Sequence, residues 1–200
     1  MITKRAKVIA IEGRDRIGKA TQTGKLMETF TNNGKRAVLL EFPLRETMTG
    51  RAIYRALESG WVKRWPLSFQ ALHLVNKLLP QIMCLPYLLL TQDYIVLDRW
   101  NTSSLVYGKV SGVPVWFSRF TSEVLIDPDL ILVLDGPGHG IPGIGDAYER
   151  DQAFQERIRA GYLAEAAQNP RTHVVIDAMG PPETVHIRVM NALVDRDLVR

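Results

Sequence analysis

The sequence predicts an α/β fold in which a five-stranded parallel sheet is flanked by helices. Short apolar runs alternate along the chain with helical patterns, as expected where crossover helices join parallel strands. A glycine-rich loop of a type that holds phosphate lies between the first strand and the first helix. The length of 200 residues suits one full-sized core, so residues 1–200 are expected to form a single domain.

Five apolar runs, several of them rich in β-branched residues, are expected to form the strands. The first has the composition of a central strand that is buried on both faces. In a parallel sheet, ligands bind beyond the carboxyl ends of the strands, so functional residues should follow these runs closely. The expected strands are Lys7–Glu12, Ala37–Phe42, Tyr94–Asp98, Leu130–Asp135 and Thr172–Asp177.

The segments between these strands carry helical patterns. Leu26 and Phe30 give the first helix its apolar spacing, and Gly34 is expected to follow its end. The third helix is strongly apolar and contains Pro80 and Pro86, so it is expected to be buried, with a kink or a break. The expected helices are Lys19–Asn32, Thr49–Ser59, Leu67 to about Thr91, Val115–Leu125, Asp151–Gln168 and Pro182–Val194.

Composition and charge narrow the function classes. The net charge of +4 fits anionic ligands such as nucleotides, but no long Lys/Arg block or basic stretch with interleaved aromatics predicts a nucleic-acid surface. The single cysteine, Cys84, excludes an internal disulfide and suits a reducing cytoplasm; its apolar neighbours place it in the core. No stretch predicts a signal peptide or a membrane span, so a cytoplasmic protein without membrane attachment is expected.

The loop after the first strand follows the pattern G-x-x-x-x-G-K-[S/T] with one substitution. Gly13 and Gly18 allow a tight path around a phosphate, and Lys19 can reach the outer phosphates of a nucleotide. Ala20 stands where a hydroxyl normally contacts Mg²⁺, and Thr21 faces a different direction. Water can fill that coordination position, so metal binding is expected to be weakened rather than lost.

Charged residues follow several strands. Arg45 and Arg99 could hold an acceptor phosphate through bidentate hydrogen bonds, while Arg14 and Arg16 could reach charge that develops during transfer. Any one of these arginines could equally be a surface charge, but their gathering at neighbouring strand ends beside a phosphate loop favours function.

Two aspartates have distinct expected roles. Asp98 closes the third strand, where it could hold Mg²⁺ through water or orient an acceptor; helix capping and an ion pair with Arg99 remain alternatives. Asp15 lies inside the phosphate loop, where phosphates would repel it unless it bonds another group, and a sugar hydroxyl is the natural candidate.

A glycine-rich segment follows the fourth strand. Residues 136–145 contain five glycines and two prolines, which excludes a regular helix, and no Lys or Arg lies between Leu134 and Glu149. A short lid over the nucleotide site is expected at about residues 136–150. The composition of this segment is equally consistent with a passive surface loop.

These motifs together resemble the thymidylate kinase family, among the nucleoside-monophosphate kinases of the P-loop class. The resemblance covers nearly the whole chain, and the order and spacing of the motifs make it far more specific than the phosphate loop alone. The matching segments are Glu12 to Gln22, Phe42-Pro43-Leu44-Arg45 with Gly50, Asp98-Arg99-Trp100 with Ser103, Asp127 to Leu130, Tyr148-Glu149 with Phe154-Gln155, and Ile176-Asp177-Ala178.

The resemblance implies a P-loop kinase fold and a transferase of nucleotide biosynthesis, with ATP as donor, Mg²⁺ as metal and dTMP as the usual acceptor. It also suggests a homodimer and small-molecule nucleotides as partners. The ATP-binding positions would be Gly13, Arg14, Asp15, Arg16, Ile17, Gly18, Lys19, Ala20 and Thr21.

Family roles can be carried onto matching positions. The catalytic residues would be Lys19, Arg16, Arg99 and Asp98, with Asp98 also the metal residue, and Arg16 resembles the loop arginine of members whose lid lacks one. Asp15 would bond the deoxyribose 3′-hydroxyl, and Arg45 and Arg99 the acceptor phosphate. The remaining substrate-binding positions would be Phe42, Pro43, His73, Lys77, Ser103, Tyr107, Tyr148 and Gln155.

The base-binding positions depart from the family. The family usually carries a Phe that stacks on thymine and, four residues later, an Arg that bonds a base carbonyl. One register places His73 and Lys77 there, and a register shifted by one turn remains open. Lysine can donate one bond but not a bidentate pair, so base selectivity is then relaxed or redirected, for example to a modified pyrimidine. His73 could equally be a histidine at the edge of the core.

Two alternatives to a dTMP kinase stay open. The chain could phosphorylate another or a modified pyrimidine monophosphate. It could also be a catalytically weak nucleotide-binding protein with a regulatory role. Ala20 and the altered lid favour this alternative.

Overall fold

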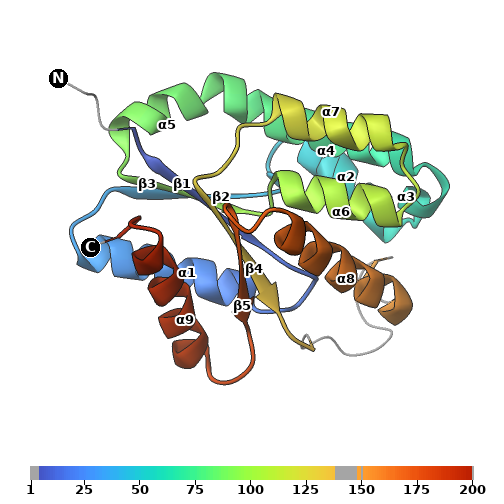
Figure 1. Cartoon of the computed structure of the whole chain (residues 1–200). Coiled ribbons are helices and arrows are strands. Elements are labelled where there is room, and N and C mark those ends of the chain that lie inside the picture. Colours follow the sequence, from blue (N-terminus) through green and yellow to red (C-terminus); the bar gives the residue numbers. More distant parts are fainter. Residues whose placement is uncertain (1–4, 138–147, 150, 200) are drawn as a thin grey trace.

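The computed structural model describes residues 5–137, 148–149 and 151–199 (Figure 1). Five parallel strands form one sheet in the order β2-β3-β1-β4-β5, which confirms the predicted five-stranded parallel sheet. β1 lies at its centre, flanked by β3 and β4, and β2 and β5 form its edges. The strands are β1 (Lys7–Glu12), β2 (Ala37–Glu41), β3 (Tyr94–Asp98), β4 (Leu130–Asp135) and β5 (His173–Asp177).

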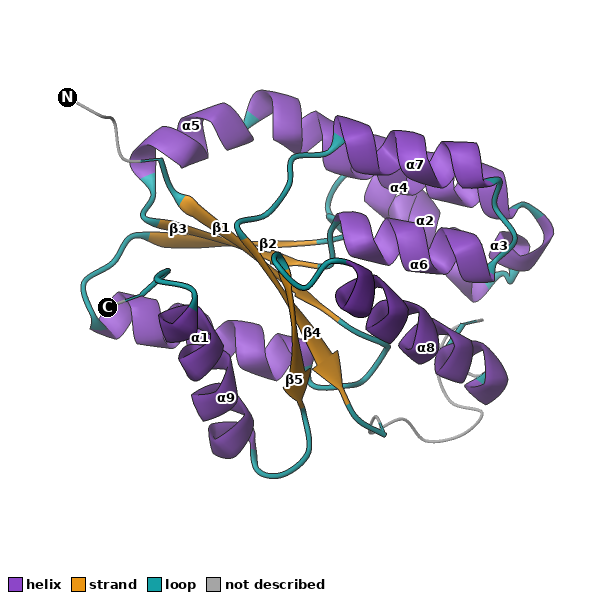
Figure 2. Ribbon diagram, viewed as in Figure 1, coloured by secondary structure: helices purple, strands orange, loops and turns teal. Residues whose placement is uncertain are grey.

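Helices cover both faces of the sheet (Figures 1 and 2). One face packs against α1 (Lys19–Asn32) and α9 (Pro182–Asp195), and its core includes Ile9, Ile11 and Leu26. The opposite face carries the second core, built on Val8, Ala10 and Leu97. The remaining helices are α2 (Met48–Glu58), α3 (Trp61–Arg64), α4 (Pro66–Met83), α5 (Leu85–Thr91), α6 (Asn101–Val110), α7 (Val115–Val124) and α8 (Gln152–Gln168).

The strand register brings functional residues to one edge of the sheet. Asp98 pairs with Ile11 of β1 on one side and with Glu41 of β2 on the other. Beyond the strand ends, the Arg99 N–H donates to the Ile11 carbonyl at 3.1 Å, and the Phe42 N–H donates to the Asp98 carbonyl at 2.9 Å. These bonds continue the sheet into the turns that carry the predicted site residues.

Two helices were not predicted. The four residues of α3 form a single turn, too short for a periodic apolar pattern. α6 is buried although it begins with the run Asn101 to Ser104, because these small polar residues bond groups of β1, β5 and α4 instead of facing water. A helix that is polar at its buried end carries no amphipathic signal for sequence reasoning to find.

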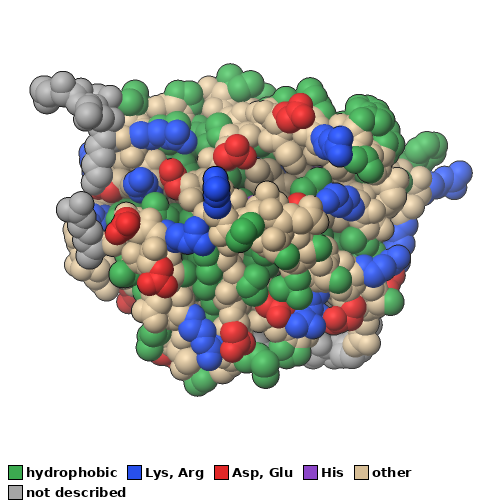
Figure 3. Space-filling view, in the orientation of Figure 1, with side chains coloured by type: hydrophobic (Ala, Val, Ile, Leu, Met, Phe, Trp, Pro, Cys, Tyr) green, Lys and Arg blue, Asp and Glu red, His purple; other side chains and the backbone are tan. Residues whose placement is uncertain are grey.

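The predicted third helix is divided at Cys84 into α4 and α5. Pro80 lies within α4, and Pro86 lies in the first turn of α5, where proline is tolerated because no intrahelical N–H bond is lost. The predictions that this stretch is buried and that Cys84 belongs to the core are wrong: Cys84 is exposed, and Ile82 and Met83 are 69% and 75% exposed. Figure 3 shows hydrophobic side chains along the margin where α5 and α7 lie.

No single helix of the described residues has the length and apolar character to cross a membrane. α4 and α5 meet those two criteria only as a pair, and they are bent by 50° at their junction. The predicted lid falls largely on residues 138–147 and 150, which lie outside the described residues.

Candidate active site

The phosphate loop connects β1 to α1 and requires its glycines. Gly13 and Gly18 have φ values of 140° and 96°, which L side chains rarely adopt. A Cβ at Gly13 would also lie 2.7 Å from the Leu134 carbonyl oxygen of β4. The loop leads directly into the first turn of α1, whose unpaired N–H groups favour an anion. Ile17 of the loop is buried in the α1 face of the core.

Lys19 lies across this loop. Its Nζ donates to the carbonyls of Gly13 and Arg14 at 3.1 and 2.7 Å. Burial, together with the nearby Arg99 charge, lowers the pKa of Lys19 to about 8. The ammonium is therefore held among the loop carbonyls, next to the N-terminus of α1.

Asp15 of the loop is the centre of a polar cluster. Its carboxylate pairs with the Arg99 guanidinium and accepts from the Tyr107 hydroxyl and from Gln155 Nε2, each at 2.8 Å. The Asp15 N–H in turn donates to Gln155 Oε1 at 3.1 Å. Burial raises the pKa of Asp15, but the Arg99 and Lys19 charges outweigh it and hold that pKa well below its usual range. Asp15 is therefore ionised throughout the physiological range.

A cavity of about 190 Å³ opens beside this cluster. It is lined by most of the residues that the sequence nominated for substrate binding, although those residues come from segments far apart in the chain. These are Asp15, Phe42, Pro43, His73, Lys77, Arg99, Ser103, Tyr107 and Tyr148. Sequence reasoning did not select the other lining residues, Tyr54, Leu57, Phe69, Gln70, Ser104 and Glu149.

Arg45 lies apart from the cavity lining. Its side chain is exposed, and its guanidinium stacks over the Tyr54 ring at 4.6 Å from the ring centre. Tyr54 does line the cavity, so Arg45 covers the outer side of a wall residue.

α4 contributes Phe69, His73 and Lys77 from three successive turns of one face. The Phe69 ring is buried and meets the His73 ring edge-on at 4.7 Å. Burial, and then the Lys77 and Arg99 charges, lower the pKa of His73 well below its usual value, so its imidazole is neutral. The pattern of a Phe followed four residues later by a cavity residue therefore occurs at Phe69 and His73. This register lies one turn before the register that places His73 and Lys77 at these two positions.

Lys77 lies deeper and is almost fully buried. Its Nζ donates to the Trp100 carbonyl at 2.7 Å and to Ser104 Oγ at 2.6 Å. Burial, partly offset by the Glu12 charge, lowers its pKa to about 8.

Glu12, the last residue of β1, holds the turn that presents Arg99. It accepts from the N–H groups of Trp100 and Ser103 at 2.8 and 3.2 Å, and from Ser103 Oγ at 2.5 Å. Arg99 has a φ of 65°, unusual for a residue other than glycine, and this bonding holds the residues that follow it. The sequence signal that could have predicted this role of Glu12 is a charged residue at the end of a buried strand.

Asp98 is the candidate metal residue. Its Oδ1 atom is buried and has no hydrogen-bond partner among the described residues. Burial raises its pKa, although the Lys19 and Arg99 charges oppose the rise. No group of three or more His, Cys, Asp or Glu side chains in the described ranges could hold a metal. One orphaned carboxylate oxygen still fits Mg²⁺, which keeps several waters and takes one or two carboxylates beside nucleotide phosphates.

The position directly after Lys19 carries no hydroxyl, because it is Ala20. Ala20 and Thr21 are both exposed, and Thr21 makes no side-chain hydrogen bond among the residues that the structure describes.

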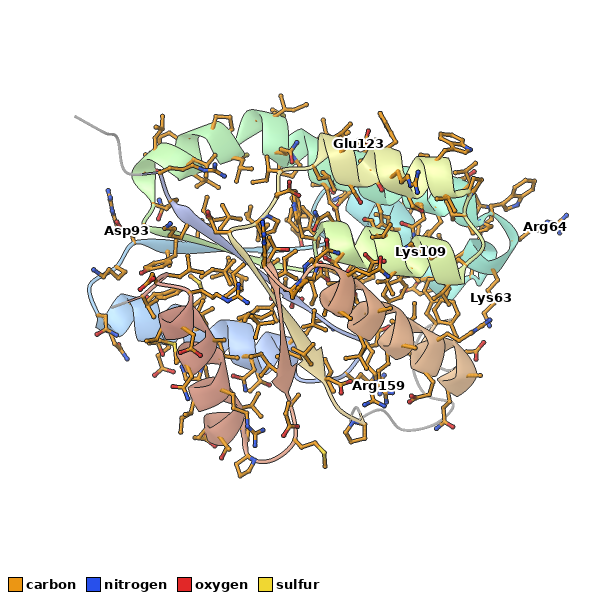
Figure 4. The ribbon with its side chains drawn as sticks, in the orientation of Figure 1. Lys63, Arg64, Asp93, Lys109, Glu123 and Arg159 are labelled. Carbon is orange, nitrogen blue, oxygen red and sulfur yellow. The ribbon has the colours of Figure 1, made fainter. Side chains whose placement is uncertain are left out.

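Two loop arginines reach the α8 side of the site. Arg16 pairs with Glu149 at 2.8 Å, and Arg14 pairs with Glu156 and donates to the Pro137 carbonyl. Arg159 of α8, which is labelled in Figure 4, makes two hydrogen bonds to Asp135, at 2.6 and 2.9 Å. Charges of both signs therefore border the loop beyond the end of β4.

Comparison with known proteins decides what kind of protein carries this site. The family model described as thymidylate kinase matches residues 11–189. The chain belongs to the thymidylate kinase family. It is therefore a kinase, a phosphotransferase that uses nucleotides, and its sheet and helices form the P-loop kinase fold.

Relatives of this thymidylate kinase family member span nearly its whole length. The thymidylate kinase of Cereibacter sphaeroides is 32% identical, covering 92% of this chain and 93% of that protein. The human thymidylate kinase is 30% identical over 96% of this chain and 92% of its own. The solved thymidylate kinase of Candida albicans superposes with a TM-score of 0.74 at 24% identity, covering 97% and 93% of the two chains.

Proposed function

We propose that this chain transfers the terminal phosphate of ATP to dTMP and forms dTDP and ADP. The observation that carries the proposal is the Asp15–Arg99 pair, which joins the phosphate loop to the cavity. Asp15 belongs to the loop for the donor, whereas Arg99 follows the neighbouring strand and lines the cavity for the acceptor. The terminal phosphate of ATP and the phosphate of dTMP can therefore meet between Asp15 and Arg99.

Positioning and electrostatics supply the catalysis, without a covalent intermediate on the protein. Lys19 and the N–H groups at the start of α1 neutralise the donor phosphates. Arg16 and Arg99 stabilise the charge that spreads over the transferred group, and Arg45, which stacks on the wall residue Tyr54, attracts the acceptor phosphate. Mg²⁺, held through Asp98 and water, supplies further charge neutralisation when bound. The other loop residues, from Gly13 to Thr21, cradle the donor.

The acceptor nucleoside occupies the cavity. The Phe69 ring supplies a flat apolar surface for the base, and Asp15 accepts a bond from the 3′-hydroxyl of the sugar. Tyr107 donates to the same carboxylate and lines the cavity, so it lies next to the sugar. The walls are completed by Phe42, Pro43, His73, Lys77, Ser103 and Tyr148, with Gln155 holding Asp15 in place.

A panel of acceptors tests the assignment. Purified protein with ATP and Mg²⁺ is offered dTMP, dUMP, dCMP and dGMP, and ADP formation is followed. We expect the highest kcat/KM with dTMP. A higher value with another monophosphate would replace dTMP as the substrate. Binding of ATP and dTMP without any ADP would instead indicate a regulatory nucleotide-binding protein.

Arg99 provides the test at the level of a side chain. Arg99→Ala should lower kcat/KM for dTMP by at least about 100-fold, because it removes a charge-assisted contact and leaves Asp15 unpaired. Arg36, an exposed arginine at the opposite end of the sheet, is the control for a general loss of positive charge. Near-normal turnover by the Arg99→Ala protein would remove Arg99 from the mechanism.

The setting of the enzyme is also proposed. We propose that residues 1–200 form one nucleoside-monophosphate kinase domain, with a lid at about 136–150 that closes over ATP. A homodimer is supported by the exposed apolar side chains of α4 and α5. A cytoplasmic location is supported by the lone cysteine.

A further inference from the structure

Gln70 of α4 is buried at the cavity with its amide unbonded. The residue is 5% exposed and lines the cavity, yet its side chain makes no hydrogen bond to any residue that the structure describes. The two other amide side chains of the same helix, Asn76 and Gln81, are each bonded as both donor and acceptor. Because an amide is costly to bury without a partner, Gln70 is placed to bond a molecule that enters the cavity.

The charged groups that line the cavity are satisfied within the protein. Asp15 pairs with Arg99, and Glu149 pairs with an arginine of the phosphate loop. Lys77 donates to two neutral oxygens, and the buried Glu12 carboxylate partly offsets the effect of burial on its charge. The Gln70 amide differs from these four groups because it is uncharged and unbonded.

His73, one turn after Gln70, is a second unbonded polar group at the cavity. Its ring meets Phe69 edge-on and makes no hydrogen bond within the described part of the chain. Burial, and then the Lys77 and Arg99 charges, lower its pKa well below its usual value, so the ring is neutral. A neutral imidazole has one donor and one acceptor, and a change of tautomer exchanges them. Gln70 and His73 can therefore each donate or accept a hydrogen bond.

The position of Gln70 along α4 places it away from the phosphate site. Lys77 marks the phosphate end of the helix, because its Nζ donates to the carbonyl of Trp100, the residue after Arg99. Gln70 lies two turns earlier in α4, about 10 Å away along the helix axis. A nucleotide with its phosphate at Arg99 can therefore extend along α4 and bring its base to Gln70.

Three aromatic rings connect the sugar end of the cavity to the same turn of α4. Tyr107, which donates to Asp15, has its ring centre 5.7 Å from that of Tyr148, and the Tyr148 ring centre lies 6.0 Å from that of Phe69. Phe69 directly precedes Gln70. When the 3′-hydroxyl of a nucleotide bonds Asp15, the base can therefore lie with its face on Phe69 and its edge toward Gln70.

We propose that Gln70 reads the edge of the acceptor base in either orientation of its amide, so that the cavity takes 4-amino pyrimidine monophosphates as well as 4-oxo ones. This inference rests on the proposed function, which places the base against Phe69. Thymine presents an N3–H donor beside an O4 acceptor, whereas cytosine presents an N3 acceptor beside an N4–H donor. An amide matches one pattern directly and the other after a half-turn about its terminal bond, and no bond to the described residues holds Gln70 in one orientation.

The first experiment compares dTMP with 5-methyl-dCMP, which carries the same methyl group and differs only at N3 and C4. We expect their dissociation constants, measured by calorimetry, to differ by less than about 100-fold, whereas a site with fixed donors and acceptors discriminates by about 10⁴-fold or more. Gln70→Glu provides only acceptors and should move the ratio toward 5-methyl-dCMP by at least about tenfold. Gln168→Glu, at an exposed glutamine of α8, is the control and should leave the ratio unchanged.

Two outcomes of this experiment would overturn the inference. A preference of more than about 100-fold for either nucleotide would show that the donors and acceptors at the base edge are fixed. An unchanged ratio in Gln70→Glu would show that Gln70 does not contact the base edge. A ratio of two affinities does not depend on the fraction of folded protein.

The second experiment uses only the unaltered protein, so it also decides the matter if Gln70→Glu does not fold. It measures binding of the 5-methyl-2-pyrimidinone deoxynucleotide, which keeps the N3 acceptor of 5-methyl-dCMP but carries hydrogen at C4. We expect this analogue to bind about tenfold more weakly than 5-methyl-dCMP, because the Gln70 carbonyl loses its N4–H donor. Equal binding would show that the cavity tolerates both bases without bonding the group at C4, which contradicts the inference.

Turnover of dTMP with ATP on the same sample separates the two proposals. Normal turnover with a preference of more than about 100-fold for dTMP would remove only the role of Gln70. Binding of both nucleotides in the expected ratios without any turnover would remove only the phosphoryl-transfer function. No binding of either nucleotide would remove both.

Discussion

Arg99 shows how one residue can be held in an unusual conformation by its neighbours. Its φ of 65° is maintained because Glu12 bonds the following turn and Asp15 pairs with the guanidinium. The same aspartate accepts from Tyr107 and Gln155, so three segments of the chain converge on one carboxylate. The geometry of the acceptor end therefore depends on a loop that also serves the donor.

The missing hydroxyl at Ala20 leads to a prediction about the metal. Ala20→Ser should lower the Mg²⁺ concentration for half-maximal ATP-dependent activity by about tenfold, or about 1.4 kcal/mol, because the hydroxyl oxygen can coordinate the metal in place of a water. Mn²⁺ binding in the presence of ATP, followed by electron paramagnetic resonance, gives the affinity directly. Thr21→Ala is the control and should change neither value, since that side chain is exposed. An unchanged Mn²⁺ affinity in Ala20→Ser would show that water replaces the hydroxyl fully.

Lys77 also leads to a prediction about pH and stability. Its pKa is about 8 in the folded protein and 10.5 in the unfolded chain, so between these values the unfolded chain binds more protons. Below pH 8 the charge on Lys77 therefore destabilises the folded state by its full amount, and this destabilisation is lost as the pH rises to 10.5. The stability of wild type relative to Lys77→Met should rise by about 3 kcal/mol from pH 7 to pH 10.5. Urea unfolding at both pH values measures it, and a constant difference would contradict the shifted pKa.

At the level of the elements, the approach of α2 to the turn after β2 depends on a glycine. A Cβ at Gly50 would lie 1.9 Å from the Leu44 carbonyl oxygen, and this contact sets where α2 carries Tyr54. No side chain can be fitted at Gly50 unless the helix moves away from the turn.

Gly50→Ala should therefore destabilise the protein by about 3 kcal/mol and weaken acceptor binding, because the backbone must shift at the cavity wall. Gly24→Ala is the matched control: it lies in α1 with open space around it, and alanine should stabilise that helix by about 1 kcal/mol. Thermal unfolding of both variants compares them. Similar unfolding temperatures for the two variants would show that α2 can shift without loss of stability.

The elements also show how far sequence reasoning could go. Strands buried on both faces were predicted well, because runs such as that of β4 have one simple pattern. α6 was not predicted because the residues at its buried start are polar. The break at Cys84 could not be located because proline is compatible with several positions in a helix. Residues in motifs, such as Asp15 and Arg99, could be nominated. Phe69 could be reached only through the register shifted by one turn, and Ser104 could not be nominated, because only the packing of α4 against α6 brings it to the cavity.

For the whole molecule, the exposed apolar side chains of α4 and α5 predict self-association. Ile82, Met83 and Tyr87 are each more than 65% exposed, which is unusual for a solitary soluble chain. Ile82→Lys should shift the protein from dimer toward monomer in sedimentation velocity, because it places a charge in an apolar contact. Ile187→Lys on α9 is the control, an exposed isoleucine on the other side of the sheet. A protein that is monomeric before any substitution would contradict the prediction of self-association.

The pairing of Arg99 with Asp15 has a consequence for inhibitors. A phosphate-bearing ligand must share the guanidinium with a carboxylate that already pairs with it, so part of its intrinsic affinity is spent on that competition. An uncharged compound that fills the cavity between Phe69 and Tyr107 leaves the pair intact and avoids this cost. Neutral molecules without any phosphate mimic are therefore the better starting point for blocking this enzyme.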